Sequence, residues 1–322
     1  MAVVAEEVQL VRMSAEPIER DDPRALLAVF AAITTWAYSS IVIKAIATTP
    51  LVTAFWRVWS VIPLLWLARG LQGSRRRPLG RHWLKGSIAG GLCFATHQLF
   101  FFNAVRWTSV TNVTLIGALQ PALVLLVSRP FFGERVTAWQ ILWSAVAVAG
   151  SGLVVAAGVG QTSLDLLGDL FAVGNLLAFT AYFLVSKRIR REVEPWDYVI
   201  GMTTVAGLVM AAACFLHGDD VLSPRGGEWL FLLSLGILPG TIGHLATNWA
   251  HAHARAMTIS VIMLAGPLLS SVAAWAVLGE RIEPLQGVGA AIVLVSIVLA
   301  LVQVTPGRAR ELAEAAAETD AP

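Results

Sequence analysis

Long apolar runs separated by short polar stretches recur along the whole chain. A transmembrane helix needs roughly 20 mostly apolar residues, because the hydrocarbon core of a bilayer is about 30 Å thick. Ten runs fit this length, at residues 25–43, 51–67, 86–105, 111–128, 138–157, 170–185, 198–216, 229–248, 258–278 and 285–304. A transmembrane β-barrel would instead show short segments of alternating polarity. The pattern therefore predicts an all-α polytopic membrane protein with ten transmembrane helices.

The composition agrees with a bilayer as the surrounding solvent. Of the 322 residues, 57% are apolar and 14% are charged, whereas soluble domains are about 45–50% apolar and about 25% charged. A disulfide scaffold is a poor alternative because the two cysteines, Cys93 and Cys214, both fall inside predicted spans. The densest basic cluster, Arg75–Arg77, is expected to face anionic lipid. The bilayer is thus the predicted partner, and no nucleic-acid partner is predicted.

The basic residues are distributed unequally between the two sides of this ten-span arrangement. Of the 23 Lys and Arg residues, 18 fall on the side of the two termini, 4 fall on the other side, and Arg57 lies inside the second span. Because cytoplasmic loops carry an excess of Lys and Arg, both termini are predicted to be cytoplasmic, in the inner or plasma membrane. Residues 1–24 lack the apolar segment of a signal peptide. We expect this tail and residues 305–322 to be solvated.

The chain contains an internal duplication. PALVLLVSRPFFGERVTAWQ, from residue 121, matches PLLSSVAAWAVLGERIEPLQ at an offset of 146 residues. Spans one and six also agree, at a nearby offset of 144. The matched positions include Pro121 and Pro267, Gly133 and Gly279, and Glu134 and Glu280.

The duplication predicts two repeats of five helices each. Residues 25–157 form the first repeat and residues 158–304 the second, between the tails 1–24 and 305–322. Since five is odd, the second repeat is expected to be inverted in the membrane. Secondary transporters use inverted repeats and bind substrate near the midplane between them. The alternative is an old duplication retained for packing alone.

These motifs resemble the EamA family of the drug/metabolite transporter superfamily. The resemblance rests on NAVRWTSVTNVTLIGALQP followed by FFGERVTAWQ, on NWAHAHARAMTISVIMLAGP followed by VLGERIEPLQGVGAA, and on Arg57 in AFWRVW. It implies a polytopic permease, often an exporter of amino acids or other small metabolites, working by alternating access. The second copy departs from the pattern, because its basic and Thr/Ser stretch becomes His251-Ala-His253-Ala-Arg255.

The repeated prolines and Gly-Glu pairs have two interpretations each. Pro121 and Pro267 remove a backbone donor in mid-span, which either opens space at a central cavity or is merely tolerated. Gly133 and Gly279 are expected to end helices. Glu134 and Glu280 are expected at the starts of the next ones, where negative charge is favourable. We prefer this structural role for the Gly-Glu pairs to a role in gating.

Polar stripes within the spans predict a substrate cavity. Asn175, Phe179 and Tyr182 share one face of span six, and Thr35 and Tyr38 occupy the matching face of span one. The alternative for these groups is hydrogen bonding between helices.

Two further spans carry histidines. His244 and Asn248 share a face of span eight, and His97 takes nearly the equivalent place in span three. Ionisable residues at membrane depth usually face the bundle interior. One hypothesis is that His97 and His244 line the pathway and carry coupling protons. Packing histidines with satisfied hydrogen bonds are an equal alternative.

Arg57 has three possible roles at this stage. It can snorkel to the interface, attract a substrate carboxylate, or bind a backbone carbonyl. No Asp or Glu falls within a span core, which disfavours efflux of lipophilic cations. An uncharged, zwitterionic or carboxylate-bearing substrate fits better.

The chain is predicted to be a secondary transporter of a small metabolite, with export the expected direction, as a monomer or homodimer. No cofactor is predicted. No metal is predicted either, because His251 and His253 diverge by about 200° on a helix. An intramembrane lipid-modifying enzyme is the less favoured alternative, since no HExxH, GxSxG or paired carboxylates occur in the spans. A membrane sensor without flux is the other alternative.

Overall fold

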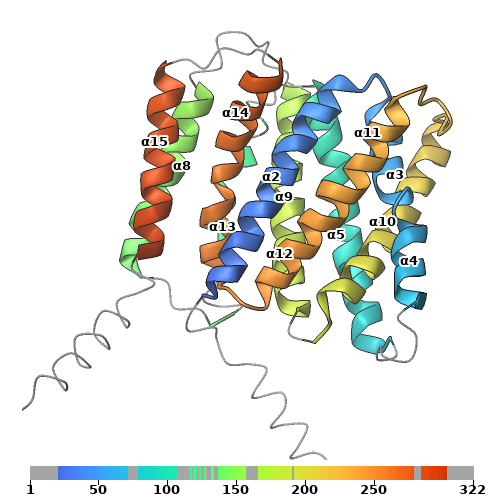
Figure 1. The fold of residues 1–322 in the computed structure, drawn as a ribbon, viewed down its shortest axis with the longest axis horizontal. Coiled ribbons are helices and arrows are strands. Elements are labelled where there is room, and N and C mark those ends of the chain that lie inside the picture. Colours follow the sequence, from blue (N-terminus) through green and yellow to red (C-terminus); the bar gives the residue numbers. More distant parts are fainter. Residues whose placement is uncertain are drawn as a thin grey trace, which may run out of the picture.

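The computed structural model describes residues 21–71, 79–107, 113, 116–117, 119–121, 123–124, 127, 132–133, 137–156, 166–190, 192–278 and 284–302. All regular structure within these residues is helical (Figure 1). The helices are α2 (Pro23–Ala45), α3 (Pro50–Trp59), α4 (Ile62–Leu71), α5 (Arg81–Trp107), α8 (Ala138–Ala156), α9 (Leu166–Ile189), α10 (Pro195–His217), α11 (Glu228–Leu235), the π-helix η3 (Gly236–Gly243), α12 (His244–His251), α13 (Ala256–Met263), α14 (Ala265–Leu278) and α15 (Pro284–Val302).

Helices occupy nine of the ten predicted spans in the described part of the chain. Seven segments are long and apolar enough to cross a membrane, and Ala138–Gly150 and Gly287–Leu299 are shorter apolar helices. Most of the fourth predicted span, residues 111–128, lies outside the described residues. The prediction of a polytopic helical membrane protein is therefore confirmed, whereas the number of ten helices stays a prediction.

Helix starts follow from residues that cap the exposed backbone N–H groups. α2 begins at Pro23, two residues before the predicted span, and the Asp22 carboxylate accepts a hydrogen bond from Arg24 N at 2.8 Å. α3 begins at Pro50 after the cap residue Thr49. Asp and Thr accept from the first free N–H groups of a helix, and proline at the first position has no N–H to satisfy. Local sequence therefore determines where both helices enter the bundle.

Three predicted spans are interrupted beside a proline. α3 and α4 are separated just before Pro63, and α13 and α14 meet at Leu264, just before Pro267. In the eighth span, Pro239 lies inside the π-helix η3. Proline lacks the N–H that would bond the carbonyl four residues earlier, and its ring clashes with that carbonyl. The breaks therefore occur where the helical hydrogen-bond ladder cannot continue.

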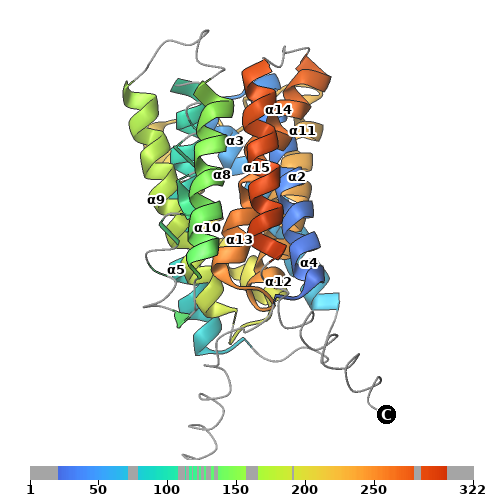
Figure 2. The ribbon, with the colours of Figure 1, turned by 90° about the vertical axis from the view of Figure 1, so that its left-hand side faces the viewer.

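Close helix packing defines two groups of helices. α5 packs against both α9 and α10, and a Cβ at Gly90 of α5 would lie only 2.0 Å from Tyr198 Oη of α10. Small residues let membrane helices approach in this way. At the opposite edge α8 and α15 lie side by side (Figure 1, Figure 2), where Trp139 Nε1 donates to Leu299 O at 2.9 Å.

Contacts between distant segments identify the two ends of the bundle. The turn between α12 and α13 contacts both Asp22, before α2, and Lys187, in the last turn of α9. At the opposite end, Glu228 at the start of α11 accepts a hydrogen bond from Ala47 N, just after α2, at 2.8 Å. We call these the Asp21 end and the Glu228 end. α2 starts at the Asp21 end and α9 finishes there, so the first helices of the two halves run in opposite directions.

Candidate functional site

A cavity lies inside the bundle between elements of both halves. Helices α2, α3 and α5 and the described residues of the fourth predicted span line one part, and α9, α12, α13 and α14 line the rest. The polar or ionisable side chains in its wall are Ser39, Ser40, Arg57, His97, Gln120, Asn175, His244, Ser260 and Ser270. None of the described residues of α8, α10 or α15 lines it.

Five of the nine residues predicted for the substrate cavity line this space. They are Arg57, His97, Asn175, Phe179 and His244. The other four, Thr35, Tyr38, Tyr182 and Asn248, do not line it. The structure therefore brings together residues from four separate helices that are up to 187 positions apart in the chain.

Arg57 is buried in the wall, with 4% of its surface exposed. Its Cζ lies 5.8 Å from the centre of the Phe102 ring, within the usual range of a cation–π contact. Its Nε is buried without a hydrogen-bond partner among the described residues. This position disfavours the expectation that Arg57 snorkels to the interface, because the side chain is buried beside Phe102 and the residue lines the interior cavity. A buried cation that lacks full hydrogen bonding favours an anionic ligand.

His97 contacts Asn175 across the cavity wall. His97 Nδ1 and Asn175 Oδ1 are 2.6 Å apart, which joins α5 to α9. The rings of His97 and Phe179 lie with their centres 4.8 Å apart. These contacts orient the imidazole, and they join two of the stripes that the sequence pattern identified separately.

His244 belongs to a hydrogen-bonded group that extends behind the wall. Its Nδ1 lies 3.0 Å from Tyr182 Oη, and Asn248 Nδ2 donates to the same Tyr182 oxygen at 2.9 Å. Tyr182 and Asn248 are both fully buried. Tyr182 of span six therefore meets His244 and Asn248 of span eight, but of these three residues only His244 lines the cavity.

The face of α2 that lines the cavity differs from the predicted one. Thr35 donates to Ala32 O at 2.7 Å, and Tyr38 Oη lies 2.8 Å from Ser234 Oγ. Both expected cavity residues are thus occupied elsewhere. Four of the lining residues, Ile33, Trp36, Ala37 and Ser40, follow i, i+3, i+4 and i+7 spacing, and Ser39 lies beside them.

Aromatic residues that the sequence analysis did not single out form part of the wall. The Trp36 ring centre lies 5.9 Å from that of Phe179 and 5.3 Å from that of His244, and Trp36 Nε1 donates to Pro239 O at 3.2 Å. Phe101 lines the same space. The helical spacing from Ile33 was the available signal for Trp36.

The repeated motif residues are only partly described. Pro121 lines the cavity, as does Gln120 directly before it, whose Nε2 is buried without a partner among the described residues. Gly133 has a left-handed φ of 67°, which favours glycine and suits the end of a helix. The backbone of Pro267 belongs to α14. Glu134, Gly279 and Glu280 lie outside the described residues.

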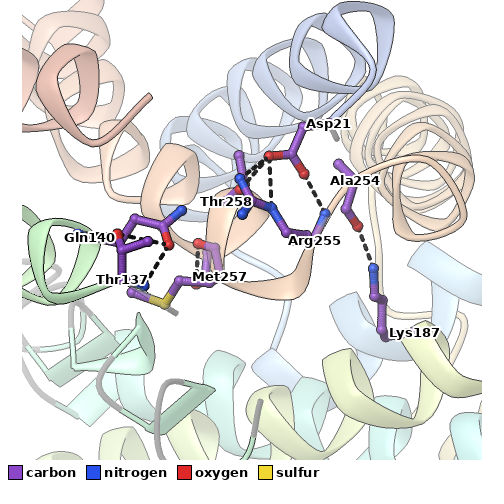
Figure 3. Close-up of polar contacts among 9 residues, drawn as sticks. Asp21, Thr137, Gln140, Lys187, Ala254, Arg255, Met257 and Thr258 are labelled. Atoms are coloured by element: carbon purple, nitrogen blue, oxygen red, sulfur yellow. Dashed lines mark hydrogen bonds and ion pairs between the residues drawn. The ribbon is translucent and has the colours of Figure 1, made fainter. Parts of the chain in front are cut away.

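The Asp21 end is held together by a buried ion pair (Figure 3). Asp21 accepts hydrogen bonds from Arg255 Nη2 at 2.8 Å, from Arg255 Nε at 3.1 Å and from Thr258 Oγ1 at 2.8 Å. It also accepts one from the backbone N–H of Arg255 at 2.6 Å. The Asp21 side chain is only 1% exposed, although we expected the tail that contains it to be solvated. These bonds connect the start of α2 to the start of α13.

Two basic residues near the end of α9 make further contacts at the Asp21 end. Lys187 Nζ donates to Ala254 O (Figure 3), and Arg190 Nε donates to Asn248 O at 2.9 Å. Burial lowers the pKa of Arg190 to about 10, against the opposing effect of Glu194, so the guanidinium is still charged at neutral pH. Both cations therefore tie α9 to the region around α12.

A metal centre has no support in the described part of the chain. No group of three or more His, Cys, Asp or Glu side chains is placed there to hold a metal ion. The cavity instead combines one cation, neutral polar groups and aromatic rings. This chemistry suits a small organic solute better than a metal ion.

Comparison with known proteins agrees with this geometry. The model of the EamA-like transporter family matches the chain twice, at residues 23–156 and 166–302. The chain is 28% identical over 208 residues to the "Aromatic amino acid exporter YddG" of Ancylobacter novellus, covering 64% of this chain and 70% of the relative. It is 23% identical over 278 residues to the "Pseudopaline exporter CntI" of Pseudomonas aeruginosa, covering 84% and 93%.

Two other matches extend the comparison. The "Probable terminal-alkyne amino-acid exporter" of Streptantibioticus cattleyicolor is 26% identical over 239 residues, covering 73% of this chain and 78% of the relative. A crystal structure with 22% sequence identity superimposes with a TM-score of 0.73 and covers 87% of this chain and 97% of the matched chain. At this identity the structural match establishes the fold alone.

Proposed function

This chain belongs to the EamA-like transporter family, and we propose from that premise that it exports a small carboxylate-bearing metabolite, such as an amino acid, across the cell membrane. The family is one of transporters, so the chain is a multi-pass membrane transporter and not an enzyme. The substrate class, the direction and the mechanism are the parts that we add.

The cavity with Arg57 in its wall is the observation that carries this proposal. Taking a guanidinium out of water is unfavourable unless a partner compensates. Arg57 has no ion pair among the described residues, and it faces neutral polar groups and aromatic rings. A substrate carboxylate would compensate the charge, and the rings of Trp36 and Phe179 would pack against an apolar side chain. The named amino-acid exporters among the relatives support this class and the export direction.

Alternating access between inverted repeats is the mechanism we propose. α2 and α9 run in opposite directions, as the first helices of inverted repeats would. The bonds of Asp21 with Arg255 and Thr258 join the two halves at one end of the cavity. We propose that this end is cytoplasmic, with both termini on that side, and that breaking these bonds opens the cavity to the cytoplasm. Transport by this mechanism can be uniport, exchange or proton-coupled transport.

Counterflow in proteoliposomes tests the function. Purified protein is reconstituted into vesicles preloaded with unlabelled solute, and uptake of labelled amino acids and other small metabolites is measured. We expect saturable counterflow for at least one carboxylate-bearing solute, with a KM about tenfold or more higher in Arg57→Gln. Saturable counterflow only for solutes without a carboxylate would refute the substrate class. No counterflow across a broad panel would favour a membrane sensor instead.

A further inference from the structure

His244 has one ring nitrogen engaged behind the cavity wall and one left without a partner. We propose that Tyr182 and Asn248 are positioning residues that hold His244 as a neutral imidazole, whose Nε2–H is the donor offered to a substrate oxygen. The substrate in this proposal rests on the proposed transport function, whereas the protonation pattern of the ring does not.

The orientation of Asn248 is set by its own helix. Asn248 Nδ2 lies 2.8 Å from the backbone oxygen of His244 and 2.9 Å from Tyr182 Oη. A backbone carbonyl only accepts hydrogen bonds, so the NH₂ group, and not the amide oxygen, must face it. One N–H of Asn248 therefore bonds the carbonyl, and the other is directed at Tyr182 Oη.

The hydroxyl of Tyr182 in turn determines which ring nitrogen of His244 carries the proton. Tyr182 Oη is hydrogen-bonded to Asn248 Nδ2 and, 3.0 Å away, to His244 Nδ1. Nδ2 can only donate to this oxygen, so Nδ1 is the acceptor that these two bonds offer to the hydroxyl proton. A neutral imidazole that accepts at Nδ1 carries its proton at Nε2. His244 is 1% exposed. A second proton would add another positive charge to a buried cavity that already contains Arg57.

The Nε2–H of His244 is then a hydrogen-bond donor without an acceptor among the described residues. This atom is buried and has no hydrogen-bond partner among the described residues, and the His244 side chain lines the cavity. A buried donor without a partner costs free energy that an acceptor on a ligand can recover. Arg57 lines the same cavity, so both groups suit one carboxylate. His244 would therefore add a directional hydrogen bond to the charge of Arg57.

His97 offers the contrasting arrangement. Its Nδ1 faces Asn175 Oδ1 at 2.6 Å, and that oxygen can only accept. The proton of a neutral His97 is therefore at Nδ1, which leaves Nε2 as an acceptor. The two histidines occupy nearly equivalent positions in the repeats, yet they have opposite donor and acceptor patterns. Only His97 retains a free lone pair for a proton or for a substrate N–H.

The protonation pattern can be measured directly on the wild-type protein. Nitrogen-15 spectra of histidine-labelled protein in detergent or lipid distinguish protonated from bare ring nitrogens, and His244→Gln identifies the His244 signals. We expect a protonated Nε2 and a bare Nδ1 at neutral pH, and a mixture of both neutral forms in Tyr182→Phe. A proton on Nδ1, or on both nitrogens, in the wild type would overturn the proposal.

Transport kinetics test whether this donor serves the substrate. Glutamine places an amide N–H near the position of Nε2, whereas the shorter asparagine does not. We expect KM within about twofold of wild type in His244→Gln and about tenfold higher in His244→Asn, with Vmax little changed, as for one lost hydrogen bond. Tyr182→Phe should raise KM severalfold alone and by less than about twofold in the His244→Gln background.

The outcomes separate this proposal from its alternatives. Equal KM increases in His244→Gln and His244→Asn would overturn the donor role. Loss of accumulation driven by a pH gradient in His244→Gln, with counterflow intact, would make His244 a proton carrier and would also overturn it. If the wild type shows no counterflow for any solute, the proposed function fails, while the nitrogen-15 result still decides the protonation pattern.

Discussion

Replacing Asp21 with Asn should open the end of the bundle where Asp21 bonds Arg255. The substitution keeps the shape of the side chain but removes its charge. Asp21 accepts two hydrogen bonds from the guanidinium of Arg255, one from Thr258 Oγ1 and one from the backbone N–H of Arg255. An amide in this place can direct only one oxygen at these four donors, and its NH₂ group would face another donor.

The magnitude follows from the burial of the pair. Removing one partner of a buried ion pair costs about 3–5 kcal/mol. The Arg255 side chain is 13% exposed and can recover some hydration, so we take the lower limit of about 3 kcal/mol. Since about 1.4 kcal/mol changes an equilibrium tenfold, the ratio of closed to open states at this end should fall roughly 100-fold.

Labelling of a cysteine in the cavity measures this change. Ser260 lines the cavity on α13, four residues after that helix begins at the Asp21 end. Ser260→Cys is introduced after Cys93 and Cys214 have been replaced, and reaction with a membrane-impermeant maleimide is followed from each side of oriented vesicles. Asp21→Asn should raise the labelling rate from the Asp21 side by one to two orders of magnitude, because the open state becomes that much more populated.

Asp22→Asn is the matched control. The Asp22 side chain accepts only from Arg24 N among the described residues, and asparagine caps a helix about as well as aspartate. Labelling in this control should equal that of the parent protein. If the labelling rate in Asp21→Asn also equals that of the parent protein from both sides, then the ion pair does not hold this end of the bundle closed.

Three further predictions concern the charge, the packing and the topology. Arg57→Gln should raise KM for a carboxylate substrate about tenfold or more while sparing an uncharged analogue; equal effects on both would contradict a carboxylate contact. Gly90→Ala should lower the free energy of unfolding by about 1–3 kcal/mol in thermal melts, because its Cβ would lie 2.0 Å from Tyr198 Oη. Gly70→Ala, with nothing within 4 Å of the added Cβ, should change it little; equal losses would refute the packing argument. Ser223→Cys, exposed in the loop before α11, should react with impermeant reagent from outside intact cells, and reaction only after lysis would reverse the topology.

The positions of the helices could be predicted because burial in lipid requires long apolar runs. The observed helices extend beyond several predicted limits, as at α5, which begins at Arg81 where the apolar run begins at Gly86. A helix continues into polar residues outside the hydrocarbon core, whereas an apolar pattern only marks the part within it. The sequence did not predict the helix breaks beside Pro63 and Pro239. A proline breaks a membrane helix only where neighbouring helices can satisfy the freed backbone groups, and those neighbours are distant in sequence.

The inward face of each helix was harder to predict. On α9 the polar stripe was informative, since Asn175 and Phe179 do line the cavity. On α2 the matching tyrosine misled the assignment, because Tyr38 pairs with Ser234 and the cavity face is rotated toward Trp36. A periodic stripe shows that a helix has a special face, but it does not say which neighbour that face contacts.

The ion pair at the Asp21 end shows the limit of composition as a guide. Asp21 belongs to an acidic stretch that is typical of a solvated tail, and its partner Arg255 is 234 residues away. Only the antiparallel arrangement of the two halves brings the start of α2 to the start of α13. A charge near a helix start can thus be structural whenever the fold places an opposite charge beside it.

The duplication accounts for where the polar residues of the cavity lie, but not for their hydrogen-bond partners. The duplication explains why His97 and His244 occupy nearly equivalent places on α5 and α12. It does not explain their different partners, because one faces the amide oxygen of Asn175 and the other faces the hydroxyl of Tyr182. Arg57 adds to this asymmetry, since the matching positions in the second half, Gly201 to Thr203, carry no charge. A cavity between symmetric halves would offer the same groups twice, whereas a substrate with distinct ends needs different groups. We propose that the differences at Arg57, His97 and His244 meet that need.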